Sequence, residues 1–116
     1  VDVEKNAIIE TIVLGEPGVV KPMAVLLSKD ATKLYVSTGR GKKLFVLDTA
    51  TRKVETSFEV GQRPWGIALS PDGKTLYSAN GPSNDLSVVD LVSKTVTKKV
   101  KLTGSPWGAI VLPHAN

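Results

Sequence analysis

Hydrophobic and polar residues alternate along this chain in short runs, and the alternation recurs every 42 residues. In residues 65–70, large apolar side chains alternate with Gly, Ala and Ser, which is typical of a strand packed closely on both faces. Pro71 and Gly73 then predict a turn, because Pro presets its φ angle and Gly accepts a positive one. Further alternating runs predict strands at residues 75–80, 86–91 and 95–102. One repeat therefore predicts four antiparallel strands, which we call a to d in chain order.

Three proline-containing triplets mark the repeat most clearly, at residues 21–23, 63–65 and 105–107. A unit of about 40–45 residues with four short strands is the sequence mark of a β-propeller blade. Such rings usually close with about 4 to 8 blades, so this chain predicts only part of one. We expect an all-β fold, a β-propeller fragment with two complete four-stranded blades and a partial blade at each end. The whole ring is expected to have roughly seven blades.

Alignment of the repeats divides the chain into four segments. Residues 1–20 are expected to hold the end of a strand c, a strand d and a long loop. Residues 21–62 and 63–104 are expected to form complete blades, and residues 105–116 to supply strand a of a closing blade. The expected partners are the missing N-terminal part of the same propeller or other subunits, because these would cover the open sheet edges.

Composition and charge exclude several classes of protein. With 41% hydrophobic and 22% charged residues, the chain resembles an ordinary folded domain. Its net charge of +4 arises from cations scattered among acids, so we expect no nucleic-acid partner. The absence of cysteine excludes disulfides, thiol catalysis and cysteine metal sites. No apolar run approaches the roughly 20 residues of a membrane span, so none is expected.

Several motifs carry a family resemblance. Residues 35–38 (Tyr-Val-Ser-Thr) and 77–80 (Tyr-Ser-Ala-Asn) stand where YVTN-type β-propeller repeats carry their naming motif. Residues 63–66 and 69–74 are similar to the typical opening of such a blade. Nearly the whole chain thus resembles a YVTN-type β-propeller repeat protein, although Met23 and Gly39 depart from the pattern, as does the turn at 29–32.

The sequence of the second blade is similar to that of the C-terminal part of quinoprotein-associated YVTN propellers. This narrower resemblance implies an association with a pyrroloquinoline quinone pathway, although no cofactor is identifiable from the chain itself. The broader resemblance implies an exported protein, periplasmic or at the cell surface. It implies no single activity, because one fold carries many functions.

The resemblance also implies that the d-to-a and b-to-c loops share one face around a central channel, where propellers usually bind ligands. We expect that face to present a small-molecule or protein site. Its candidate ligand-binding residues are Arg40, Lys42, Lys43, Arg63, Trp65, Asn84, Asp85 and Trp107. Arg63 beside Trp65 offers a rigid fork of donors for a carboxylate or phosphate, with an aromatic wall. The alternatives are that Pro-Trp-Gly is a structural plug between blades and that the basic stretch 39–43 is a solvated hairpin tip.

No catalytic or metal-binding residue is expected in this chain. Asp48 and Asp90 recur at the end of strand c, which favours a turn-capping hydrogen bond over a catalytic acid pair. His114 is the single histidine, and with no second histidine or cysteine it is expected at the surface.

Two classes of function remain open from the sequence. The leading hypothesis is a noncatalytic binding or interaction scaffold, the C-terminal part of an exported YVTN β-propeller. The alternative is a fragment of a propeller redox enzyme, or a quinoprotein-associated accessory protein, whose catalytic or cofactor ligands lie upstream.

Overall fold

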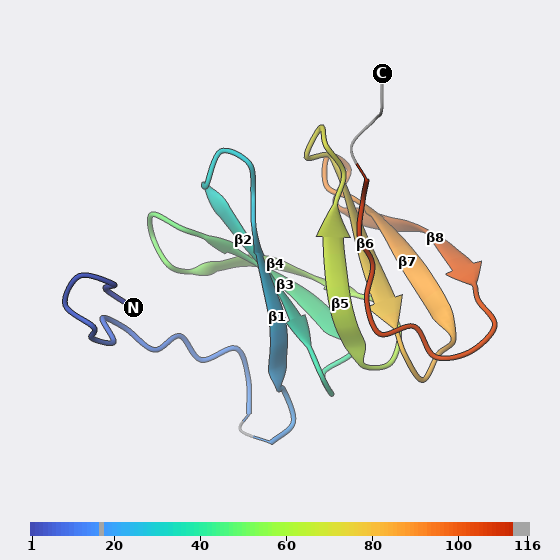
Figure 1. Ribbon diagram of the computed structural model, residues 1–116, viewed down its shortest axis with the longest axis horizontal. Coiled ribbons are helices and arrows are strands. Elements are labelled where there is room, and N and C mark those ends of the chain that lie inside the picture. The colour runs from blue at the N-terminus through green and yellow to red at the C-terminus, as the bar shows by residue number, and fades with distance from the viewer. Residues whose placement is uncertain (17, 113–116) are drawn as a thin grey trace.

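The chain folds into two four-stranded antiparallel sheets that stand side by side (Figure 1). The computed structural model describes residues 1–16 and 18–112. The first sheet, blade 1, contains β1 (Pro22–Leu27), β2 (Lys33–Thr38), β3 (Lys43–Asp48) and β4 (Val54–Glu59). The second sheet, blade 2, contains β5 (Pro64–Leu69), β6 (Thr75–Asn80), β7 (Asp85–Asp90) and β8 (Thr95–Lys101). Each sheet is a simple meander in chain order, as the sequence predicted, and the described residues include no helix that could cross a membrane.

The register of the two blades repeats with the sequence. Tyr35 pairs with Val46 in blade 1, and Tyr77 pairs with Val88 at the corresponding place in blade 2. Irregularities recur too: the pairing shifts after Pro22 in blade 1 and after Pro64 in blade 2. Equivalent residues therefore face equivalent directions, so a position in blade 1 can be compared directly with its counterpart in blade 2.

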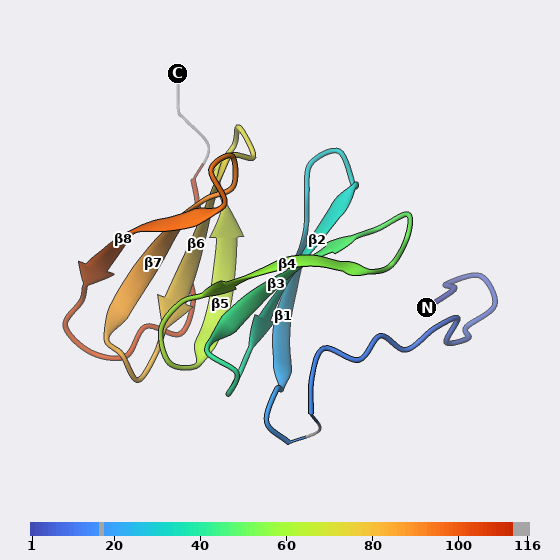
Figure 2. The same cartoon turned by 180° about the vertical axis from the view of Figure 1, so that it is seen from behind.

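The main hydrophobic core lies between the two blades. One face of blade 1 contributes Tyr35, Leu44, Val46 and Phe58, and the facing side of blade 2 contributes Leu76 and Val89. The innermost strands β1 and β5 lie close together, whereas the outermost strands β4 and β8 meet at fewer residues (Figure 2). The blades therefore diverge outward, which is the arrangement of neighbouring blades around a propeller axis.

The two terminal segments differ from the sequence-based expectation. Strands were expected at residues 7–14 and 105–112, but both segments run without a strand ladder in the structure. The described part of the N-terminal segment contains one isolated bridge, between Asp2 and Ala7. A strand needs a neighbour to receive its backbone hydrogen bonds, and neither segment has one here. Apolar side chains in both segments are consequently exposed, among them Ile8, Val13 and Ile110.

Candidate functional site

The b-to-c and d-to-a loops lie at one end of both sheets, which is the lower edge of the molecule in Figure 1. We call this end the loop face. Hydrogen bonds join its loops: the Gln62 amide donates to Ser83 Oγ at 2.7 Å, and the Leu102 amide donates to the Asn84 carbonyl at 2.8 Å. In blade 1 the Val60 amide donates to the Lys42 carbonyl at 2.9 Å. Short connections from both blades are thus held as one surface.

Two tryptophans meet at the loop face. The ring centroids of Trp65 and Trp107 are 4.7 Å apart, with the ring planes tilted by 40°. Trp65 also lies over Gly81, where an added Cβ would sit 2.3 Å from the indole ring. The Trp65 ring thus packs on the backbone of its own blade, in the loop between β6 and β7. Trp107 remains 76% exposed and presents the free aromatic surface.

The C-terminal segment, residues 105–112, which we call the trailing segment, contacts β5 through its backbone. A Cβ added to Gly66 would lie 2.5 Å from Gly108 Cα and 2.9 Å from the Trp107 carbonyl oxygen. Residues around 107–108 therefore lie against β5 at a distance that only glycine at position 66 permits. The segment occupies the side of blade 2 away from blade 1, where a next innermost strand would lie.

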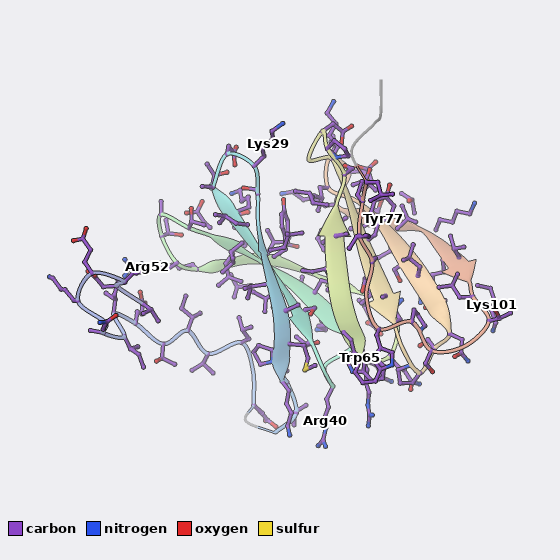
Figure 3. The ribbon with its side chains drawn as sticks, viewed as in Figure 1. Lys29, Arg40, Arg52, Trp65, Tyr77 and Lys101 are labelled. Atoms are coloured by element: carbon purple, nitrogen blue, oxygen red, sulfur yellow. The ribbon has the colours of Figure 1, made fainter. Side chains whose placement is uncertain are left out.

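The cationic residues of the predicted site are exposed. Arg63 directly precedes β5, adopts a positive φ of 48°, and accepts a hydrogen bond at its carbonyl from the Gly81 amide at 3.4 Å. Arg40 extends from the hairpin tip between β2 and β3 into solvent (Figure 3). Lys42 follows in the same tip, and Lys43 begins β3. Among the described residues no ion pair neutralises these four side chains.

Asn84 and Asp85 are engaged in holding the b-to-c loop of blade 2. Asn84 has a positive φ of 55°, and its side-chain oxygen accepts a hydrogen bond from Ser105 Oγ at 3.4 Å. Asp85 Oδ1 accepts a hydrogen bond from Asn80 Nδ2 at 2.7 Å. The structure therefore brings both residues to the loop face, but their polar atoms already serve the loop.

Sequence reasoning missed the residue at the centre of this network, Asn80. Its side chain is fully buried, donates to Ser87 Oγ at 2.9 Å and accepts from Ser78 Oγ at 3.0 Å. A buried amide must satisfy both of its ends, and Asn80 does so at the end of β6. The available signal was an asparagine closing the Tyr-Ser-Ala-Asn strand immediately before a Gly-Pro loop.

Aspartates at the opposite end of the blades cap turns, as the sequence predicted. Asp48 Oδ1 accepts hydrogen bonds from the amides of Ala50 and Thr51 at 2.9 and 2.8 Å. Asp90 accepts the equivalent bonds from Val92 and Ser93 at 2.8 and 3.3 Å. These backbone donors lower the pKa of both carboxyl groups. Neither aspartate is arranged as part of a catalytic acid pair.

The described residues contain no cluster of three or more side chains suited to holding a metal ion. His114, expected at the surface, lies outside the described residues.

Comparisons with known proteins identify the fold. No protein-family model and no curated protein matches this sequence. Among solved structures, the chain is similar to hydrazine synthase of Kuenenia stuttgartiensis, with 29% identity over 89% of this chain and 30% of that chain, at a TM-score of 0.79. It is similar to the Cps50 (Swd1) β-propeller domain of Myceliophteria thermophila, with 20% identity over 90% and 32% of the two chains, at a TM-score of 0.75.

A further likeness is to apo AztD from Citrobacter koseri, with 19% identity over 77% of this chain and 25% of that chain, at a TM-score of 0.66. The chain thus spans about a quarter to a third of the solved proteins it matches. These likenesses and the two meanders agree: the chain consists of β-propeller blades.

Proposed function

We propose that this chain is part of a propeller that serves as a noncatalytic binding or interaction scaffold, with the loop face as its ligand-binding surface. The proposal rests on the presence at this face of exposed Trp107 and of the exposed cations Arg40, Lys42, Lys43 and Arg63. A face that carries an aromatic surface and cations without an ion pair in residues 1–16 and 18–112 suits a small acidic molecule or an acidic protein segment. Asn84 and Asp85 then act by shaping the loop, because their polar atoms are committed within it.

The rest of the propeller is the partner that we assign to the uncovered faces. Val25 and Leu27 on β1 are 67% and 51% exposed, although they belong to a strand that neighbouring blades normally enclose. Exposed apolar surface of this kind favours association with another polypeptide. The YVTN type, an exported location and a quinoprotein association belong to this proposal through the sequence resemblance.

Tryptophan fluorescence tests the binding proposal directly, because the chain has only two tryptophans and both lie at the loop face. We expect titration with benzoate or inorganic phosphate to change the emission, and Arg63→Gln to weaken that response. Arg52→Gln is the matched control: Arg52 also has a positive φ, 59°, but it lies at the opposite end of the blade. An unchanged emission with acidic probes, or equal effects of the two variants, contradicts the proposal.

A propeller enzyme is the second candidate function. The observation that favours it is the 29% identity with a protein whose name, hydrazine synthase, denotes catalysis. This chain would then supply blades and loops around cofactor ligands carried elsewhere in the ring. Absorption spectra of the assembled propeller distinguish the candidates: a cofactor band supports the enzyme, whereas protein absorbance alone supports the scaffold.

A further inference from the structure

A groove opens between the two blades at the end opposite the loop face. It consists of two adjoining cavities of about 490 and 470 Å³, both lined by Lys33 and Tyr35. The second cavity is completed by residues of both blades: Val46, Glu55, Thr56, Phe58, Leu91 and Lys94. This volume lies in the range of about 300–1,000 Å³ that small-molecule sites occupy. Because two complete blades form it, the groove needs no further part of the ring.

The floor of this inter-blade groove is apolar and rigid. Tyr35 is only 5% exposed, and it belongs with Val46 and Phe58 to the core cluster that joins the blades. Leu91 packs against the same cluster from blade 2. Side chains fixed in this way form a preorganised wall for an aromatic or branched aliphatic group.

The polar groups of the groove differ in whether they already have an ion-pair or hydrogen-bond partner. Lys33 forms ion pairs with Glu55 and with Asp48, the latter at 3.4 Å, so its single positive charge is shared between two carboxylates and is not free for a ligand. Lys94, in the turn between β7 and β8, has no ion pair within the described residues. The Tyr35 hydroxyl likewise has no hydrogen-bond partner in residues 1–16 and 18–112. Two donors that line the same cavity are therefore available.

We propose that the inter-blade groove binds a small aromatic or branched aliphatic monocarboxylate. The apolar body packs on Val46 and Phe58, while the carboxylate accepts hydrogen bonds from the Lys94 ammonium and the Tyr35 hydroxyl. A carboxylate suits this pair because both groups donate hydrogen bonds and the Lys94 ammonium has no ion pair within the described residues. The site is separate from the loop face, so it stands whether or not the loop face binds a ligand.

Repetition in the chain supplies matched controls for a test. Tyr77 is the counterpart of Tyr35 in blade 2, and it lies on the face that blade 1 does not cover (Figure 3). Lys74 is an exposed lysine in a turn of blade 2 that does not line the groove. Tyr35→Phe removes the hydroxyl donor and Lys94→Gln removes the positive charge, whereas Tyr77→Phe and Lys74→Gln make the same chemical changes elsewhere.

The experiment is an NMR titration of the full chain with phenylacetate and, separately, with 2-phenylethylamine. We expect phenylacetate to shift the ring signals of Tyr35 and Phe58 and the methyl signals of Val46, whether or not the indole signals of Trp65 and Trp107 also move. Losing the Tyr35 hydroxyl or the Lys94 charge should weaken phenylacetate binding about tenfold or more, because each substitution removes a charge-assisted hydrogen bond. The two control variants should bind as the parent does.

Three results would overturn the proposal. The amine could bind as tightly as the acid, the donor variants could bind phenylacetate as well as their controls do, or the only signals that move could be those of the tryptophans. Should Tyr35→Phe fail to fold, Lys94→Gln decides, because Lys94 lies outside the core cluster.

Discussion

Single residues in the a-to-b turns show how the same backbone arises from different sequences. In blade 2, Ser70 Oγ donates to Asp72 Oδ1 at 2.6 Å, and Gly73 has a φ of 72°. In blade 1, Ser28 Oγ donates to Asp30 Oδ1 at 2.7 Å, and Ala31 takes the glycine position with a φ of 62°. The Ser-x-Asp pair therefore sets the turn even where glycine is absent.

A pair of substitutions tests this interpretation. Gly73→Ala should destabilise blade 2 by about 1 kcal/mol, because alanine is strained at positive φ. Space is not the cause, since an added Cβ would meet nothing within 4 Å. Ala31→Gly should have a smaller effect in the stabilising direction, because relief of strain is partly offset by a more flexible unfolded chain. Urea unfolding midpoints measure both, and a neutral Gly73→Ala would refute the role assigned to positive φ.

The four turn aspartates predict an acid limit to stability. Hydrogen bonds from Thr32 and Ser28 lower the pKa of Asp30 from 3.8 to about 2, and the pKa values of Asp48, Asp72 and Asp90 are lowered by equivalent donors. A carboxyl whose pKa is lower in the folded state stabilises the fold fully above its unfolded pKa. That contribution to stability is lost as the pH falls through the pKa that the carboxyl group has in the folded state.

Urea midpoints should therefore be level above about pH 5 and decline towards pH 2. Asp30→Asn should make the decline shallower, because asparagine does not titrate. The slope should persist in about 1 M salt, which screens exposed ion pairs but leaves local hydrogen bonds in place. A midpoint that rises on acidification has the opposite sign and would contradict the assignment.

At the scale of the strand, position in the ring decides how much a side chain contributes. Leu27 on β1 and Leu69 on β5 occupy equivalent places, yet Leu27 is 51% exposed while Leu69 packs on the core cluster. The difference arises because blade 1 covers β5, whereas the N-terminal segment borders Leu27 on β1 without burying it.

Alanine substitution should expose this difference. Leu69→Ala should cost about 1–3 kcal/mol of unfolding free energy through lost burial and a cavity, whereas Leu27→Ala should cost less than about 0.5 kcal/mol. Chemical denaturation of the two variants provides the measurement, and each serves as the other's control. Equal losses would mean that β1 is covered in solution as β5 is.

Contact between the trailing segment and β5 makes a second prediction at this scale. Gly66→Ala should push residues 107–108 away from β5 and separate the two indole rings, because the new Cβ has no room. Gly108→Ala is the control, since an added Cβ there meets nothing within 4 Å. Near-ultraviolet circular dichroism should lose its tryptophan signal in the first variant alone. Retention of that signal in Gly66→Ala would show that the segment docks differently.

The sequence predicted the strands well because each is encoded locally. Alternation, Pro-Asp-Gly chemistry and the repeat located all eight strands to within a residue or two at their ends. The terminal segments could not be predicted from the same signals, because a strand also requires a partner that local pattern does not supply. The candidate cations were located, but the Asn80 network and the groove beside Tyr35 were not, since both depend on pairing between distant segments.

The whole molecule has one well-covered interface and two open flanks. The core between the blades buries Leu44, Leu76 and Val89 completely, while β1 and the trailing segment face outward. Hydrogen exchange should follow this division, because local opening is easiest where few contacts must break. Amides of β2, β3, β6 and β7 should exchange slowest, and those of residues 1–14 and 105–112 fastest. Mass-spectrometric exchange on the chain checks this, and strong protection of either terminal segment would reveal a partner that pairs with it.

The meander within each blade also determines the order in which the chain can assemble. Every strand pairs with its immediate successor across a short turn, whereas the cluster joining Tyr35 to Leu76 spans most of a repeat. Closing a short loop sacrifices less chain entropy than closing a long one, and hairpins form in about 1–10 μs. Each blade can therefore pair its strands before docking on its neighbour. On the ribosome, blade 1 can complete its sheet before blade 2 has emerged. Its apolar face then stays uncovered until about forty further residues have been synthesised.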